Sequence, residues 1–211
     1  MPFEYSCFIS YRNAKQPLGE AFVDELEAAL SSELELLTNK PVYVDKSRLQ
    51  GGDRFNPALQ EALCKSVCML MVYTPMYFDP CGTYCAREYR AMVRLEQERF
   101  EMLGDAVDAT HGLIIPVVFR GRKFLPKEIS DHRHYHDFSD FLLIGEQMAR
   151  HPTYAPQIKE IAAYIHDRCT ALEQLADMYN DCTEFLFPSD ADIREWLAEV
   201  APPAMRFPGV N

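Results

Sequence analysis

A glutamate occupies a position of chemical interest in the segment TYCAREYRAM. If this segment is a helix, Glu88 shares one stripe of its surface with Tyr84 and Met92, which are each four positions away. Such a stripe is at least partly buried, and a buried carboxylate is costly unless something in the protein uses it. Glu88 is therefore the first candidate for a functional residue. The alternative is an exposed helix residue paired with Arg87 or Arg90.

The cysteines form two C-x3-C pairs that could suggest a zinc site. The pairs are Cys64 with Cys68 and Cys81 with Cys85. Cys64 ends an expected helix, whereas Cys68 lies inside an expected strand, so their side chains would point in different directions. We therefore expect no zinc site at these cysteines.

The histidines of HRHYH are a stronger metal-binding pattern. In a strand, alternation would place His132, His134 and His136 on one side. The flanking Asp131 and Asp137 suit a solvated edge equally well. The sequence leaves metal binding by these histidines open, and the predicted functional site contains no metal.

The chain alternates strands with helices. Strands are expected at 4–11, 41–45, 67–74, 112–119 and around 135–138. Helices are expected at 18–37, 57–64, 84–100, 156–179 and 189–200, from apolar residues with a period of 3.6 and from helix-start signals at Asn56-Pro57, Thr83 and Ser189. The strands expected at 67–74 and 112–119 are continuous apolar runs, as expected for strands that are buried on both faces.

This alternation predicts a doubly wound α/β fold with a parallel sheet. In such sheets, ligands bind at the carboxyl ends of the strands. The expected strand ends deliver four segments to that edge, namely 10–12, 45–55, 74–88 and 120–123. Glu88 lies in one of them.

The composition indicates which partners the protein can bind and in which cellular compartment it lies. The net charge of −11 argues against binding to duplex nucleic acid, which needs a basic face. The start of the chain does not resemble a signal peptide, and its apolar runs are too short to span a bilayer. Seven cysteines, an odd number, favour free thiols in a reducing compartment, so we expect a cytoplasmic protein.

An ordered set of short motifs resembles one protein family. The motifs are FISYR at 8–12, Asp45 followed by a loop with LQGG at 49–52, ALCKSVCMLMVYTPMY at 62–77 and YCARE at 84–88. Together they resemble the TIR (Toll/interleukin-1 receptor) domain in its bacterial and plant-like branch. The resemblance implies a flavodoxin-like fold with five parallel strands in the order 2-1-3-4-5. We expect a TIR domain at 1–175 and a helical C-terminal extension at 176–211.

The resemblance also implies an activity. Many TIR domains of this branch cleave NAD+ between nicotinamide and ribose, and their products are ADP-ribose or cyclic and modified forms of it. The family's catalytic glutamate ends the motif W-C-x-x-E, which corresponds here to Glu88. The aromatic residue of that motif corresponds to Tyr84, where tryptophan is more usual. Ring stacking should survive this change with less contact area.

The expected chemistry gives the neighbouring residues roles. Expulsion of nicotinamide leaves positive charge on the ribose, which a preorganised carboxylate at Glu88 would stabilise. Other expected substrate-binding residues are Ser10 and Asp45 as polar contacts, Tyr11, Phe55 and Tyr84 as stacking surfaces, and Arg12, Lys46, Arg48 and Arg54 as cations for the pyrophosphate. The chain has no GxGxxG motif, so NAD+ would be a substrate and not a bound cofactor.

Two other functions remain open from the sequence. One is a non-catalytic TIR module that acts by assembly. The other is a flavodoxin-like enzyme similar to nucleoside deoxyribosyltransferases, which also use a glutamate. The resemblance implies self-association, with the loop at Gly51-Gly52 as a candidate contact, and by analogy a separately encoded partner in Thoeris-like antiphage defence. The acidic extension could contact such a partner.

Overall fold

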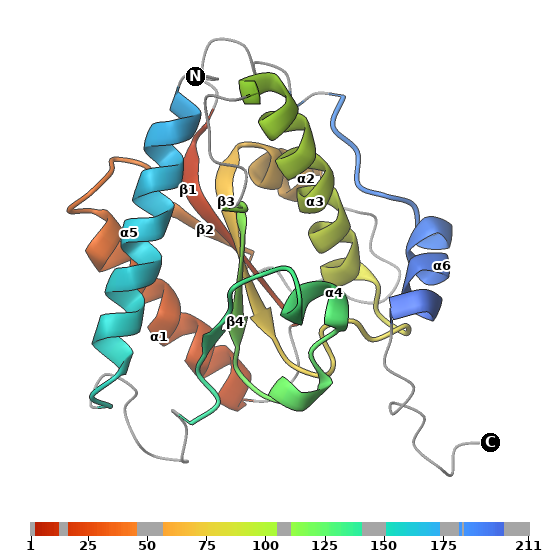
Figure 1. The fold of residues 1–211 in the computed structure, drawn as a ribbon, viewed down its shortest axis with the longest axis horizontal. Coiled ribbons are helices and arrows are strands. Elements are labelled where there is room, and N and C mark those ends of the chain that lie inside the picture. The colour runs from red at the N-terminus through yellow and green to blue at the C-terminus, as the bar shows by residue number, and fades with distance from the viewer. Residues whose placement is uncertain are drawn as a thin grey trace.

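A parallel sheet forms the centre of the computed structural model, which describes residues 3–12, 17–45, 57–104, 111–140, 151–173, 182 and 184–200. Within these residues, five strands form one sheet: β1 (Tyr5–Tyr11), β2 (Val42–Val44), β3 (Ser66–Tyr73), β4 (Ile114–Val118) and β5 (His136–Asp137). Their order is β2-β1-β3-β4-β5, and every neighbouring pair is parallel. The expected strand order and the flavodoxin-like α/β fold class are confirmed (Figure 1).

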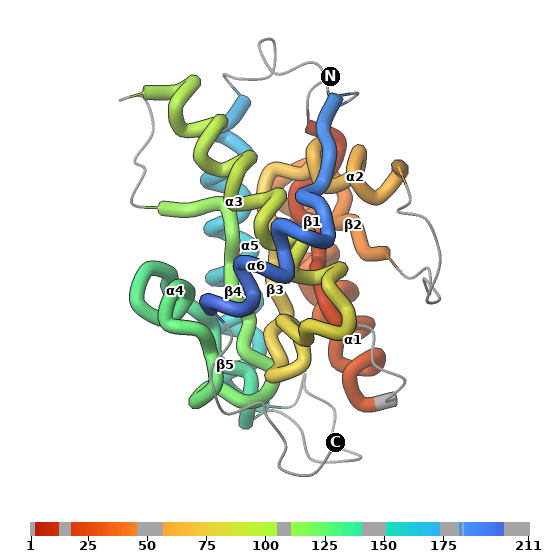
Figure 2. The backbone as a smooth tube through the Cα atoms, turned by 90° about the vertical axis from the view of Figure 1, so that its right-hand side faces the viewer, coloured from red at the N-terminus to blue at the C-terminus, as the bar shows by residue number. Residues whose placement is uncertain are grey.

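Helices cover both faces of this sheet. On one face lie α1 (Pro17–Leu34) and α5 (Tyr154–Leu172), and on the other lie α2 (Pro57–Cys64) and α3 (Tyr84–Leu103), as Figure 1 shows. The helix α6 (Asp190–Val200) lies outside α3, on the side that faces the viewer in Figure 2. Because both faces are covered, β3 and β4 are buried along their whole length. The edge strands β2 and β5 are short, with three and two residues.

Some elements differ from the sequence-based prediction. The first helix ends at Leu34 and not at Leu37, because the chain then leaves the sheet and exposes its apolar residues, with Leu36 81% exposed. A 3₁₀ turn, η2 (Arg122–Phe124), and a short helix, α4 (Lys127–Ser130), lie between β4 and β5. Neither is long enough to show a period in the sequence. The helix expected at 156–179 is α5, which begins at Tyr154, and the residues from 174 to its expected end at 179 lie outside the described part of the chain.

The C-terminal helix α6 packs onto α3. Its start has the expected capping box, in which the Ser189 hydroxyl donates to Asp192 Oδ2 at 2.7 Å and the Asp192 N–H donates to Ser189 Oγ at 3.3 Å. The Trp196 ring stacks on Tyr89 of α3, with ring centroids 5.8 Å apart. The Thr83 side chain does not cap α3, which corrects the prediction, but donates to Asp190 Oδ1 at 2.6 Å. Residue 83 therefore connects α3 to α6.

A disulfide joins Cys64 at the end of α2 to Cys182 in the extension. The expectation that the cysteines are free thiols is wrong for this pair, which weakens the argument from free thiols for a reducing compartment. The two residues are 118 positions apart, and nothing in their spacing indicates that they meet. The disulfide also excludes Cys64 from a zinc site. Cys68 and Cys85 are buried free thiols, and Cys81 is an exposed one.

Candidate active site

Glu88 and Ser10 meet between the sheet and α3. Ser10 is the penultimate residue of β1, and strand alternation directs its side chain to the face that α3 covers. Glu88 lies in the second turn of α3 and is only 8% exposed, and Met92 on the same stripe is fully buried. The Ser10 hydroxyl donates to Glu88 Oε2 at 2.5 Å. The expected burial of this stripe is confirmed.

Pairing of Glu88 with a neighbouring arginine is not what the structure shows. Arg87 pairs with Asp190 of α6 at 3.6 Å, and Arg90 pairs with Glu128 of α4 at 3.8 Å. Both arginines therefore contact elements outside α3. The alternative interpretation of Glu88 as an exposed, arginine-paired helix residue is wrong.

The buried Tyr77 extends the hydrogen-bonded group by one residue. Its hydroxyl lies 2.5 Å from Ser10 Oγ. A serine hydroxyl has one proton, so when Ser10 donates to an ionised Glu88, the Tyr77 hydroxyl must donate to Ser10. The result is a chain of donors from Tyr77 through Ser10 to Glu88. Sequence reasoning did not include Tyr77 in the site, although it ends the TPMY motif directly after β3.

The electrostatic environment of Glu88 disfavours its ionised form. Burial raises the pKa of Glu88 to about 8, the hydrogen bond from Ser10 opposes this rise, and the negative charge of Asp45 adds to it. Burial also raises the pKa of Tyr77, so its hydroxyl keeps its proton and remains a donor. A carboxylate with this pKa can change its protonation state near neutral pH, which is a property of many catalytic carboxylates.

Arg12 connects the end of β1 to the turn before α3. Its Nη1 donates to the Gly82 carbonyl at 2.8 Å, and its Nη2 pairs with Asp79 Oδ2 at 3.0 Å. A Cβ atom at residue 82 would overlap the Arg12 guanidinium, so a side chain there would displace Arg12 from this position. Arg12 thus positions the start of α3. We expected Arg12 to bind the pyrophosphate, but in the structure its guanidinium is paired with Asp79.

The other expected site residues divide into two groups. The half-buried Tyr11 and Asp45 lie together at the ends of β1 and β2, where the Tyr11 hydroxyl donates to the Asp45 carbonyl at 3.4 Å. Tyr84 is half-buried and begins α3, one turn before Glu88. The residues of the second group, Lys46, Arg48, Arg54, Phe55 and Gly51-Gly52, lie outside the described residues.

One group of metal-ligand type occurs among the described residues, and it is not at this site. It consists of His134, His136 and Glu160, at the opposite edge of the sheet from β2. The part of the site that the structure describes therefore offers one buried carboxylate and two hydroxyl groups in a hydrogen-bonded chain. Such an arrangement can stabilise a developing positive charge or position a hydroxyl group of a ligand.

Comparison with known families identifies the chain. A family model for the TIR domain matches residues 7–149, about two thirds of the 211 residues. The chain belongs to the TIR domain family, which confirms the resemblance seen in the motifs from FISYR to YCARE. A search of curated proteins gave no match. Among the described helices, none has the length and apolar character needed to cross a membrane.

Proposed function

We propose that this TIR domain cleaves NAD+ between nicotinamide and ribose, with Glu88 as its catalytic carboxylate. The observation that carries this proposal is the buried Glu88 carboxylate, held by the Ser10 hydroxyl at 2.5 Å at the carboxyl end of β1. Ligand sites of doubly wound sheets lie at this edge. The TIR family includes NAD-cleaving enzymes, and the carboxylate is in the motif YCARE.

The proposed role of Glu88 is to stabilise charge in the transition state. The ribose becomes oxocarbenium-like as the bond to nicotinamide breaks, and nicotinamide leaves as a neutral group. A water molecule, or a nucleophilic group of the same molecule for a cyclic product, then bonds to the ribose carbon and loses a proton to solvent. A carboxylate fixed in a water-poor site interacts with that charge more strongly than with the ground state. Ser10 and Tyr77 would fix the orientation of the carboxylate. Tyr84 would provide a stacking surface, and Tyr11 and Asp45 would contact the substrate at the end of β2.

This role requires an ionised Glu88, and the pKa of about 8 then predicts a pH dependence. In the free protein at pH 7 most Glu88 side chains are protonated. The cationic ribosyl–nicotinamide centre would favour ionisation on binding. We expect kcat/KM to rise with pH and to level off above about 8.

The wider setting is proposed by analogy with the family. We propose a TIR domain at 1–175 followed by an extension at 176–211, self-association of TIR domains, and a cytoplasmic location. The product would be ADP-ribose or a cyclic or modified form of it, made for a separate protein in antiphage defence. Mass analysis of the products from NAD+ would identify which form is released.

The decisive experiment compares Glu88→Gln with Glu101→Gln, an exposed position on the same helix. Nicotinamide release from NAD+ is measured for both variants and for the unmodified chain, at high protein concentration. We expect Glu88→Gln to lose about 1,000-fold or more in kcat, the upper range for removal of a preorganised electrostatic group. Glu101→Gln should retain full activity.

Two results would contradict this proposal. One is cleavage by Glu88→Gln at the rate of the unmodified chain. The other is the absence of any nicotinamide release from the unmodified chain under conditions in which it self-associates. A biological output that survives in Glu88→Gln would favour a non-catalytic assembly module.

A further inference from the structure

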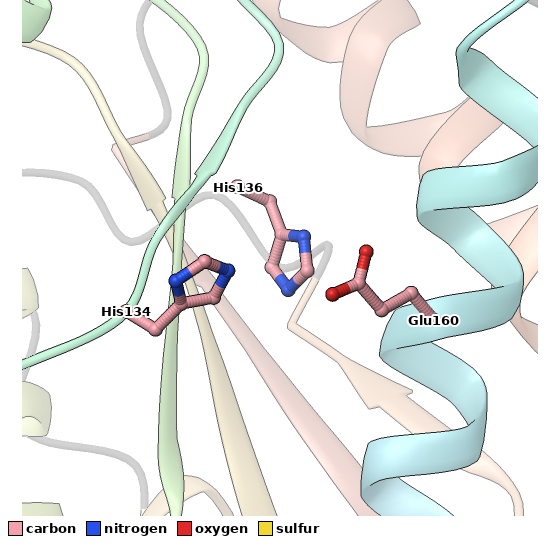
Figure 3. Close-up of side chains that lie close together, drawn as sticks. All are labelled: His134, His136 and Glu160. Carbon is pink, nitrogen blue, oxygen red and sulfur yellow. The ribbon is translucent and has the colours of Figure 1, made fainter.

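Three side chains of metal-ligand type converge at the β5 edge of the sheet. His136 begins β5, and His134 lies two residues before it. Glu160 comes from α5, and its carboxylate points toward the His136 ring (Figure 3). One donor atom from each of the three lies within 4.8 Å of the others. The two imidazole rings meet edge to face, with centroids 5.4 Å apart. His132 of the same HRHYH segment is not part of this group.

The spacing of the donor atoms is close to that around a bound zinc ion. Zinc binds imidazole nitrogen and carboxylate oxygen at about 2.0–2.2 Å, so two donors on a tetrahedral ion are roughly 3.4 Å apart. In the structure no two of the three donor atoms are more than 4.8 Å apart. They therefore need to approach one another by little more than 1 Å to bind a zinc ion. His134 and Glu160 are exposed and can make this adjustment by rotation of their side chains, while His136 is 8% exposed and fixed by packing.

The surroundings leave these donors available to an ion. Within the described part of the chain, the His136 side chain packs among its neighbours, and no hydrogen bond engages its ring. His134 and Glu160 are both exposed, so an ion can reach the group from solvent.

We propose that His134, His136 and Glu160 bind one zinc ion, with water in the fourth position. Two imidazoles and one carboxylate are a donor set of zinc sites, whereas Mg²⁺ and Ca²⁺ prefer oxygen donors alone. The ion would join the two-residue strand β5 to α5. β5 is three strand spacings from β1, about 14 Å, so the site is separate from Glu88 and does not depend on the proposed NAD+ cleavage.

The test is a calorimetric titration of the metal-free chain with zinc chloride. The variants are His134→Ala and Glu160→Gln, and the matched control is His132→Ala, an exposed histidine two positions away. We expect one zinc ion per chain, a loss of affinity of more than about 100-fold in His134→Ala, and no change in His132→Ala. Outer-shell partners of metals already contribute 10- to 100-fold, so a direct ligand should contribute more.

Two further measurements separate this site from other zinc binding. Cys81 is an exposed free thiol, so Cys81→Ser is titrated in parallel and should bind zinc unchanged. Amide hydrogen exchange in β5 should slow on zinc addition in the unmodified chain but not in His134→Ala. The proposal is overturned if the unmodified chain binds no zinc, if His134→Ala binds it equally well, or if Cys81→Ser abolishes binding.

Discussion

The two ends of α3 each bury an ionisable side chain, but they stabilise its charged form to very different degrees. Near the C-terminal end, Arg99 is fully buried and donates to the carbonyls of Cys64, Ser66 and Val67 at 2.7–3.1 Å. Its guanidinium also lies 4.8 Å from the Phe3 ring centroid. Near the N-terminal end, Glu88 accepts a hydrogen bond from Ser10, and its pKa is raised to about 8.

This difference indicates a structural role for Arg99 and supports the functional role that we propose for Glu88. Arg99 donates to three backbone acceptors, which connect α3 to the start of β3. Glu88 is buried with too little compensation to stay ionised at neutral pH. Poorly compensated buried groups lower stability and are found chiefly where function needs them.

The largest expected effect comes from Glu88→Gln, which should stabilise the protein at alkaline pH. The folded-state pKa of about 8 lies above the ordinary glutamate value of 4.5, so the ionised side chain disfavours the folded state. This cost is absent below pH 4.5, grows as pH rises and is complete above pH 8. The variant should gain as much as about 5 kcal/mol at pH 9. Urea unfolding at pH 4 and pH 9 measures it, and an equal gain at both pH values would contradict the explanation.

Arg99→Ala should destabilise the protein by about 3–5 kcal/mol, because it leaves buried carbonyl groups without a donor. Chemical unfolding of Arg99→Ala and of Gln97→Ala, an exposed position on α3, measures the difference. Gln97→Ala should change the free energy of unfolding by less than about 0.5 kcal/mol. Comparable losses in the two variants would show that the carbonyl contacts of Arg99 contribute little.

Loss of the disulfide at the Arg99 end of α3 should have the next largest effect. Cys182→Ser removes a link across 118 residues, and we expect a loss of about 2–4 kcal/mol. Thermal unfolding with and without reductant is the measurement. Reductant should lower the Tm of the unmodified chain and leave that of Cys182→Ser unchanged. A Tm of the unmodified chain that does not respond to reductant would indicate that the bond does not form in solution.

The smallest effects concern the neighbours that set the pKa of Glu88. Ser10→Ala removes a hydrogen bond that lowers the pKa, so the pKa should rise, whereas Asp45→Asn removes a negative charge, so the pKa should fall. Each shift should be about 1 unit or less. NMR titration of the Glu88 carboxyl carbon follows both variants without requiring any activity. An unchanged pKa in both variants would mean that burial alone sets it.

The sequence predicted those features that depend on local pattern. The apolar runs of β3 and β4 and the periodicity of α3 identified the elements, and the stripe through Met92 indicated that Glu88 is buried. The TIR motifs supplied the strand order, which local pattern alone leaves open. Ser10 was expected at the site, and the structure places its hydroxyl in direct contact with Glu88.

The features that the sequence did not predict depend on contacts between distant segments. Tyr77 joins the site only because β1 and the turn after β3 lie side by side. The Cys64–Cys182 bond and the pairing of Thr83 with Asp190 require the path of the extension. His134 and His136 gain Glu160 as a neighbour, while His132 is excluded, because β5 is shorter than the pattern suggested.

The contact of Arg12 with Gly82 and Asp79 has a consequence for motion within the site. Arg12 follows Ser10 and Tyr11 in the chain, and Gly82 precedes Thr83 and Tyr84, so one side chain links the two backbone segments that carry the site. The end of β1 and the start of α3 should therefore fluctuate together, and the distance between Ser10 and Glu88 should vary little. A carboxylate held in this way has a low reorganisation energy when charge develops beside it.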